Sequence, residues 1–532
     1  MSSKGKIARA AGVMSVATFI SRILGFIRDM ILARYFGATG TSDVFFVAFR
    51  IPNLLREVFA EGSMSSAFVP VLTEYQTKEG HDEANRLVRS TFLFLLVVVG
   101  SLCLAGIIFA PAIVKVIALG WDSGSEKFVS AVLLTRIMFP FLLCVSLASV
   151  VMGALNTRGV FFIPALAPAV LNIVTIICIP VLALQFTNPI ISAAIGITVG
   201  GLMQFLFQIP SFLKHGFSFS DGAGTGEGSP RPYYIYHPGL KRIGLLIIPM
   251  TAVLAVNQIN IFISTILASY LAEGSISYLY YSMRLIQFPI GIFGVAMGMA
   301  VLPTLSEHAA KKQFGALKED FSFALRLLFF ITVPAMVGLI ALRLPIVSSL
   351  YQHGEFSRQA TSGTADALMF YAFGIWAIVG VRVLNATFYS MQDTKTPFKI
   401  MVCGVLLNII CSVSLMGPLK YNGLAFANSL SAMFNFILLF YCLRKKLGGI
   451  GSRRIVVSFL KIGLAAAVMG ICGWFATKGA LWTLSGHTGQ KAGFLTIAIS
   501  GCLGIYFFVA YLLRIEEMGY LVKKVKERIT NR

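Results

Sequence analysis

The sequence holds 532 residues, of which 57% are hydrophobic and only 12% are charged. An average soluble chain is about a quarter charged, so this chain lacks the polar surface that a water-soluble fold of its size needs. The soluble classes are therefore excluded. Lipid solvates apolar faces directly, and about 20 apolar residues form one spanning helix. The composition predicts an all-α integral membrane protein with room for a dozen or more spans.

The formal net charge is +22, from 44 lysines and arginines against 22 acidic residues. In a soluble protein this charge would indicate a nucleic-acid partner. Here most of the basic residues lie in short connections between apolar runs, where they set membrane topology and attract anionic lipid. We therefore expect membrane lipids, and no nucleic acid, as partners of this charge.

The first apolar run follows three basic residues and superficially resembles a signal peptide. Arg22, Arg28 and Asp29 interrupt it, however, and no clean small-residue cleavage site follows it. We interpret the run as a retained first span. The second run contains Pro52 and Gly62, which predict a bent or broken helix.

Apolar runs separated by polar breaks predict about fourteen transmembrane helices. Their approximate bounds are 10–35, 41–75, 86–117, 127–156, 162–186, 189–213, 237–272, 277–305, 315–343, 361–391, 396–417, 422–445, 454–477 and 492–514. With the N-terminus in the cytoplasm, the connections assigned to the outer side hold few basic residues: Arg34, Lys115, Lys127, Arg343, Arg358, Lys420, Lys478 and Lys491. This bias follows the positive-inside rule, and the even number of spans places both termini in the cytoplasm.

The two halves of the chain contain an internal repeat. ILARYFGATGTSDVFFVAFR from Ile31 matches ILASYLAEGSISYLYYSMR from Ile266, AFVPVLTEY from Ala67 matches AVLPTLSEH from Ala300, and AVLNIV from Ala169 matches VLLNII from Val405. The three matches occur in the same order at offsets of 233 to 236 residues. Six spans in each copy give both copies the same orientation, so the pattern predicts a parallel repeat with a substrate site between its halves.

The repeat and the Gly- and Ser-rich stretch between its copies predict five parts. They are an N-terminal six-helix lobe (1–215), a cytoplasmic linker (216–236), a C-terminal six-helix lobe (237–446), two further helices (447–515) and a basic cytoplasmic tail (516–532).

No motif for nucleotide, metal or covalent chemistry stands out. The eight cysteines form no CxxC pair, the six histidines form no HExxH, and neither a GxxxxGK[ST] loop nor a GxSxG elbow occurs. We therefore expect that the protein is not an enzyme and that it binds neither ATP nor another cofactor. Transport work would draw on a gradient, the membrane potential or the substrate itself.

Charged residues inside the spans are the strongest functional signal, because each costs at least about 2.5–3.5 kcal/mol on insertion scales and marks a functional cavity. Within the first two spans and the eighth they are Arg22, Arg28, Asp29, Asp43, Arg50, Arg56, Glu57, Glu61 and Arg284. Seven residues return a helix to nearly the same face, so Arg22 and Asp29 share a face and Arg28 lies about 120° around it. Asp29 is expected to orient Arg28.

The remaining charges of the second span form a cavity charge network by the same spacing argument: Asp43, Arg50, Glu57 and Glu61. A buried structural network of ion pairs is the alternative, since such groups normally pair.

The repeat separates structural from functional charges. At an offset of 235 residues, Asn257, Ile263 and Ser264 occupy the positions of Arg22, Arg28 and Asp29. The second half thus dispenses with these charges, which favours a substrate role for them. Arg284 aligns within one residue of Arg50, so an architectural origin stays open for it. The planar guanidinium suits a phosphate or diphosphate, and we predict substrate binding by Arg22, Arg28, Asp29, Arg56 and Arg284.

Four segments resemble a known family. SRILGFIRDMILARYFGA from Ser21, DVFFVAFRIPNLLREVFAEGSMSSAFVP from Asp43, YYSMRLIQFPIGIFGVAMGMAVLP from Tyr280 and FYSMQDTKTP from Phe388 are similar to the MurJ/MviN lipid II flippases of the multidrug/oligosaccharidyl-lipid/polysaccharide exporter superfamily. The resemblance runs essentially end to end. It implies fourteen spans in the bacterial inner membrane, a central cationic cavity, and a groove for an undecaprenyl tail formed by the last two spans.

The resemblance also implies a function and its partners. Lipid II would cross to the outer leaflet by alternating access without ATP, for cell wall synthesis, through a monomer that works beside cell wall synthesis proteins. The family's essential arginines fall on Arg22, Arg28, Arg56 and Arg284, and its aspartate on Asp29. This chain has Gln287 and Met283 where many relatives have acidic residues. Some members bind sodium in the C-terminal lobe. The metal ligands here are unknown, and the polar candidates are Asn257, Gln258 and Asn385.

Three alternatives stay open at this point. A flippase for another polyprenyl-diphosphate-linked oligosaccharide would need the same diphosphate chemistry. A multidrug cation antiporter of the superfamily would need buried carboxylates without an excess of arginine, which the first two spans contradict. A membrane enzyme would need a histidine or carboxylate cluster at one membrane face, and no convincing cluster occurs in the sequence.

Overall fold

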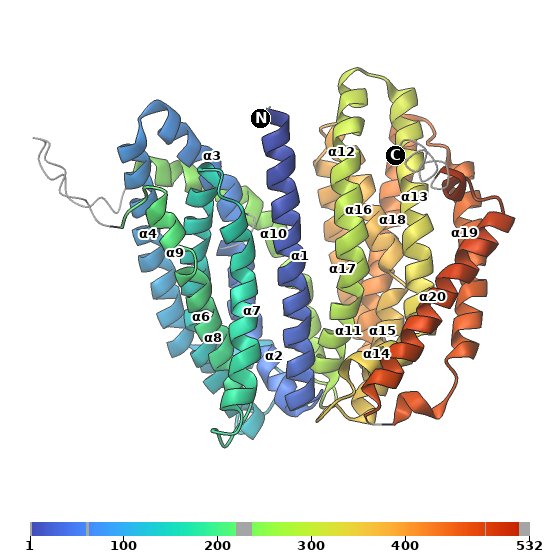
Figure 1. Cartoon of the computed structure of the whole chain (residues 1–532), viewed down its shortest axis with the longest axis horizontal. Coiled ribbons are helices and arrows are strands. Elements are labelled where there is room, and N and C mark those ends of the chain that lie inside the picture. The colour runs from blue at the N-terminus through green and yellow to red at the C-terminus, as the bar shows by residue number, and fades with distance from the viewer. Residues whose placement is uncertain (1–2, 60–62, 220–236, 485, 521–532) are drawn as a thin grey trace, which may run out of the picture. The chain divides into compact units, whose positions relative to one another are not determined.

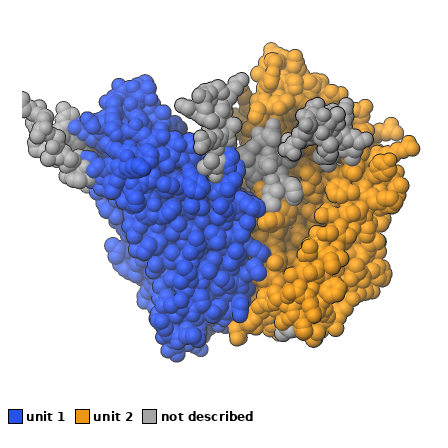
Figure 2. All heavy atoms as spheres, in the orientation of Figure 1, with its two compact units in different colours: residues 1–270 blue, residues 271–532 orange. Residues whose placement is uncertain are grey.

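A computed structural model describes residues 3–59, 63–219, 237–484 and 486–520, and within these ranges every regular element is helical (Figure 1). Ten helices or consecutive helix pairs in the described residues are long and apolar enough to cross a membrane. The predicted class, an all-α integral membrane protein, is confirmed. Packing contacts divide the chain into unit 1, residues 1–270, and unit 2, residues 271–532, which Figure 2 colours separately.

The helices of unit 1 run from the N-terminus to the turn after residue 269. They are α1 (Ser3–Phe36), α2 (Gly40–Phe59), α3 (Ser63–Lys78), α4 (His81–Ile108), α5 (Ala110–Ile117), α6 (Glu126–Thr157), α7 (Phe162–Leu182), α8 (Ile191–Leu206), α9 (Ile209–Lys214) and α10 (Pro238–Ser269).

Unit 2 contains the second set of helices and the two helices that the repeat leaves over. They are α11 (Ser275–Pro289), the π-helix η1 (Ile290–Gly294), α12 (Val295–Ala310), α13 (Phe314–Ala341), α14 (Arg343–Tyr351), α15 (Arg358–Ala372), α16 (Ile375–Ser390), α17 (Lys395–Leu419), α18 (Tyr421–Leu447), α19 (Ser452–Ala476), the 3-10 helix η2 (Ala480–Thr483) and α20 (Thr488–Leu512).

Thirteen of the fourteen predicted spans coincide with one of these helices or with two consecutive ones, and the span 277–305 covers α11, η1 and α12. The repeat is visible in their lengths: α4 and α13 both have 28 residues, and a short helix, α5 or α14, follows each of them. Their first residues, His81 and Phe314, lie 233 positions apart, as do the first residues of α7 and α17, Phe162 and Lys395. The duplicated sequence therefore gives a duplicated order of helices.

The second span of each copy contains a proline within its helices. In unit 1, α2 continues through Pro52 and ends at Phe59, and residues 60–62, which include Gly62, are outside the described part. In unit 2, α11 ends at Pro289 and passes through the π-helix η1 into α12. Proline lacks the N–H of an α-helical hydrogen bond and its ring displaces the carbonyl of the preceding turn. A local π-helix accommodates that displacement.

Helix α10 begins the second copy of the repeat, yet it packs on α2, α3, α4 and α5 of unit 1. Its first turn is fixed there by polar contacts: His237 Nε2 lies 3.1 Å from Glu83 Oε1, and Arg242 Nη2 donates to Glu74 Oε2 at 2.8 Å. The predicted linker, 216–236, falls almost entirely on the residues outside the described part, and so does the predicted tail from residue 521 on.

Candidate functional site

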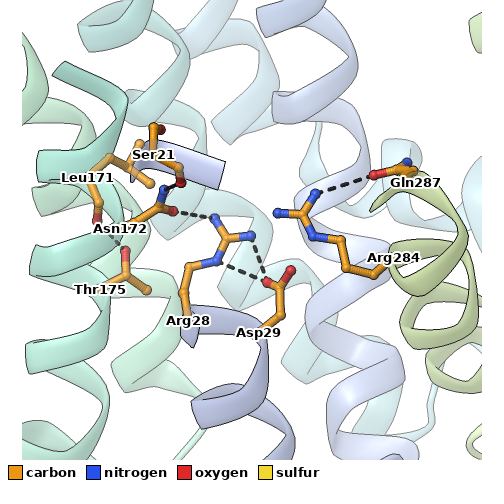
Figure 3. A network of polar contacts seen from close by, with 8 residues as sticks. All are labelled: Ser21, Arg28, Asp29, Leu171, Asn172, Thr175, Arg284 and Gln287. Atoms are coloured by element: carbon orange, nitrogen blue, oxygen red, sulfur yellow. Dashed lines mark hydrogen bonds and ion pairs between the residues drawn. The ribbon is translucent and has the colours of Figure 1, made fainter. Parts of the chain in front are cut away.

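Arg28 lies inside the first span and is held by partners on two helices of unit 1 (Figure 3). Its Nε and Nη2 donate to Asp29 Oδ1 at 3.1 and 2.7 Å, and its Nη1 donates to Asn172 Oδ1 of α7 at 3.1 Å. The Arg28 side chain is only 13% exposed. The hydrogen bonds fix the plane of the guanidinium group, which matters because a planar fork binds phosphate oxygens in pairs.

Asp29 is 1% exposed and adjoins Arg28 on the same helix. Neighbouring residues on a helix point about 100° apart, so the long arginine side chain must fold back to reach its neighbour. The expected contact between the two side chains is present. The pair has no net charge, however, so Arg28 supplies oriented donors rather than excess positive charge.

Arg22 supplies the net charge in the first span. Its side chain is exposed, and it lies six residues before Arg28 on α1, about 120° from it on an α-helix. Asp29 shares the helical phase of Arg22 but is buried. The first span therefore presents one accessible guanidinium and one that is half-buried and anchored.

The charges of the second span also lie in unit 1. Arg56 Nε donates to Asn53 Oδ1 at 3.1 Å, and Gln258 Nε2 of α10 donates to Glu57 Oε2. Asp43 is 4% exposed, and it and Arg50 both have polar or electrostatic partners in the structure. Glu61 is outside the described residues. Glu57 thus links α2 to α10, and pairing between the members of the predicted network stays a prediction.

Arg284 lies in α11 of unit 2, and its Nη1 donates to Gln287 Oε1 at 3.4 Å (Figure 3). Gln287 is a neutral amide, so this contact orients Arg284 without neutralising it. Met283 is partly exposed beside it. Neither Met283 nor Gln287 carries a charge that could compensate Arg284.

The polar candidates for an ion site are found in different surroundings. Gln258 is engaged with Glu57, and Asn385 Oδ1 in α16 is buried without a hydrogen-bond partner among the described residues. The side chain of Asn257 is outside the described part. Among the described residues, no group of three or more histidine, cysteine, aspartate or glutamate side chains is placed to hold a metal.

Asn172 is the site residue that the sequence analysis missed as a partner of Arg28. It is 7% exposed on α7, it contacts Arg28, and its Nδ2 donates to the Ser21 carbonyl at 3.2 Å. The repeat did single out its segment, AVLNIV, as a match to VLLNII. A polar asparagine within an otherwise apolar span was the signal that could have indicated a buried partner.

Comparison with known proteins gives concordant matches. The family described as "Lipid II flippase MurJ" matches residues 32–488. The probable lipid II flippase MurJ of Vibrio cholerae is 35% identical over 98% of this chain and 98% of its own length. The lipid II flippase MurJ of Burkholderia cenocepacia is 34% identical over 96% of this chain and 97% of its own.

Solved structures extend these matches to the fold. A lipid II flippase MurJ in an inward closed conformation has 29% identity and a TM-score of 0.77, over 94% of this chain and 98% of its own. An inward-facing multidrug resistance transporter of the MATE family has a TM-score of 0.67 at 13% identity, over 82% of this chain and 98% of its own. At that identity the second likeness concerns the fold alone.

Proposed function

The chain belongs to the MurJ family of lipid II flippases, and we propose that it moves lipid II from the inner to the outer leaflet of the bacterial cytoplasmic membrane for cell wall synthesis. The substrate is an undecaprenyl-diphosphate-linked disaccharide-peptide. Transport proceeds by alternating access, and the protein acts as a transporter rather than an enzyme.

The observation that carries this proposal is the guanidinium of Arg28, held inside a spanning helix by Asp29 and Asn172. A charge at membrane depth is costly and indicates a polar ligand. The lipid diphosphate is such a ligand, and an arginine stays charged at neutral pH and presents paired donors to it. Arg22 adds the net positive charge that the Arg28–Asp29 pair does not supply, and Arg56 and Arg284 add further guanidinium groups.

The topology that fits this direction of transport has both termini in the cytoplasm, as the positive-inside bias favours. No ATP is used. A membrane potential that is positive outside drives a cationic, unloaded site back toward the cytoplasm, and sodium or another ion can couple to the same cycle. The working unit is a monomer, in the membrane beside the proteins of cell wall synthesis.

Replacement of Arg28 or Arg284 by alanine tests the proposal in a flippase-depleted strain. Each variant should lose complementation, and lipid II should fail to become accessible in the outer leaflet, while the variant protein stays at its normal level. Arg136→Ala is the matched control: Arg136 also lies in a span, α6, but it is exposed and donates to the Ile107 carbonyl. Normal growth of the Arg28 variant would contradict the site.

Substrate exchange separates lipid II from the other polyprenyl-diphosphate cargoes. The chain should restore growth to a strain that lacks its lipid II flippase and should not restore a strain that lacks a flippase for another undecaprenyl-linked oligosaccharide. The opposite pattern would be consistent with a diphosphate-binding site but would contradict lipid II as the substrate.

A further inference from the structure

Asn172 makes two hydrogen bonds to one neighbouring helix. Its Nδ2 donates to the carbonyl of Ser21 at 3.2 Å, and its Oδ1 accepts from Arg28 Nη1 at 3.1 Å (Figure 3). Ser21 and Arg28 lie seven residues apart on α1, which places them two turns apart on nearly the same face. The amide of Asn172 on α7 therefore contacts two groups of α1 that belong to residues two turns apart.

The orientation of this amide follows from its partners. A backbone carbonyl can only accept a hydrogen bond and a guanidinium can only donate one. Only one of the two amide orientations satisfies both, with Nδ2 toward Ser21 and Oδ1 toward Arg28. The Ser21 carbonyl thus fixes the direction in which Asn172 presents its acceptor to Arg28.

Asn172 and Asp29 hold different parts of the Arg28 guanidinium. Asp29 Oδ1 accepts from Nε and Nη2, and Asn172 Oδ1 accepts from Nη1. The acidic partner sits on the same helix as Arg28, so it would follow any displacement of that helix. Asn172 sits on α7, which packs along α1. Of these two partners, Asn172 is the one that fixes the guanidinium relative to a second helix.

We propose that Asn172 is a positioning residue that sets the Arg28 guanidinium in the orientation that receives the substrate diphosphate. This inference rests on the proposed function. Ordering a long side chain on binding weakens affinity, and a guanidinium that is already ordered avoids that loss. Without Asn172, the guanidinium loses its hydrogen bond to α7, while its charge and its contact with Asp29 remain.

The alternative role of Asn172 is to pack α1 against α7. A double-mutant cycle distinguishes the two roles, because a residue that acts through Arg28 has no effect once Arg28 is gone. Asn172→Ala and Asn172→Leu are made in the unmutated chain and in an Arg28→Ala background. Leucine has the same branching and the same number of side-chain heavy atoms as asparagine, and it removes both hydrogen bonds, so it fills the site if the alanine variant is poorly folded.

Thr175→Val is the matched control. Thr175 lies one turn further along α7, is 0% exposed, and donates to the carbonyls of Leu171 and Gly196 at 2.9 and 3.1 Å. Valine removes these two bonds without changing the partners of Arg28. A general loss of α7 packing would therefore affect this control as it affects the Asn172 variants.

The full chain in lipid nanodiscs is titrated with purified lipid II and with undecaprenyl diphosphate, which lacks the sugar and peptide. In the unmutated background the Asn172 variants should weaken binding of both ligands about three- to tenfold, a range set by the cost of ordering one side chain. In the Arg28→Ala background they should change neither affinity, and Thr175→Val should change neither in the unmutated chain.

Equal losses in both backgrounds would overturn the positioning role and assign Asn172 to packing. Binding of undecaprenyl diphosphate without preference for lipid II would overturn the substrate proposed above, while the cycle would still measure the action of Asn172 on Arg28. Failure of the unmutated chain to bind either ligand would overturn both proposals.

Discussion

A cluster of charges in unit 2 fastens the two C-terminal helices to α13. Arg326 Nη1 of α13 lies 2.5 Å from Glu516 Oε2 and 2.7 Å from Glu517 Oε1, in the segment after α20. Ser458 Oγ of α19 donates to Glu517 Oε2 at 3.1 Å. The two carboxylates are nearly equidistant from Arg326, but Glu516 is 72% exposed and Glu517 is 1% exposed.

Burial, not distance, should decide which carboxylate matters. Glu516→Gln removes an exposed ion pair, which is worth about 0–1 kcal/mol. Glu517→Gln leaves a mostly buried Arg326 without its buried counter-charge, and removal of one partner of a buried pair costs about 3–5 kcal/mol. The contact of Arg326 with Glu516 remains in the Glu517 variant, so we expect a loss at the lower end of this range, about 3 kcal/mol. We expect this loss to exceed that of the Glu516 variant even though Glu516 accepts the better-aligned hydrogen bond from Arg326.

Hydrogen exchange in the full chain in nanodiscs measures the local opening of α19 and α20. A loss of about 3 kcal/mol raises the opening equilibrium by about two orders of magnitude, and 1 kcal/mol raises it about fivefold. Arg326→Met combined with Glu517→Leu should open less readily than Arg326→Met alone, because the buried carboxylate is then absent as well. Equal changes of the opening equilibrium in the two glutamine variants would contradict the greater importance of the buried carboxylate. So would additive effects of Arg326→Met and Glu517→Leu in the double variant.

Four further substitutions test three polar sites in unit 2 by thermal unfolding. The ammonium of Lys491 is 0% exposed and donates to Gln352 Oε1 at 3.1 Å, so Gln352→Leu should destabilise by about 1–3 kcal/mol, whereas Lys491→Met should be neutral or stabilising; the reverse order would contradict this assignment. Tyr506→Phe removes a buried hydrogen bond of 2.7 Å to a carbonyl of α13 and should cost about 1 kcal/mol; an unchanged midpoint would contradict it. A hydrogen bond from Lys446 lowers the pKa of Asp393 to about 2. Because the folded pKa lies below the ordinary value of about 3.9, this stability is complete above about pH 4 and is lost between about pH 4 and 2. Asp393→Asn should therefore cost about 1 kcal/mol at pH 7, a value discounted for the exposed lysine, and the difference should vanish near pH 2.

The sequence predicted the features that depend on local pattern. Apolar runs predicted the spans, and the repeat offset of 233 to 236 residues reappears in the starts of α4 and α13. Intramembrane charge singled out Arg28 and Asp29, and adjacency alone made their contact predictable. These predictions needed no knowledge of which helices pack together.

Contacts between distant helices could not be predicted in this way. Lys491 was assigned to an outer connection by its polar neighbours, but the structure buries it completely against α14. The contact of Asn172 with Arg28 joins residues 144 positions apart, and no spacing rule relates them. Similarly, α10 begins the second repeat copy yet packs on helices of unit 1. Each of these features depends on tertiary packing, which the local pattern of a sequence does not specify.

The repeat also allows a comparison of the first span with its counterpart in the second copy. Asn172 and Asn408 occupy equivalent positions, but Asn172 contacts Arg28 on another helix, whereas Asn408 accepts a hydrogen bond from Ser412 of its own helix at 3.4 Å. Ser264, next to the equivalent of Arg28, donates within its own helix as well. The second copy of the repeat, α10 to α18, therefore forms the same order of helices without the arginine. An arginine at membrane depth costs several kcal/mol at least on some scales, and a fold that does not require it has no reason to retain it. We infer from this that an anion binds the guanidinium of Arg28, as proposed above, within the frame of the duplicated helices.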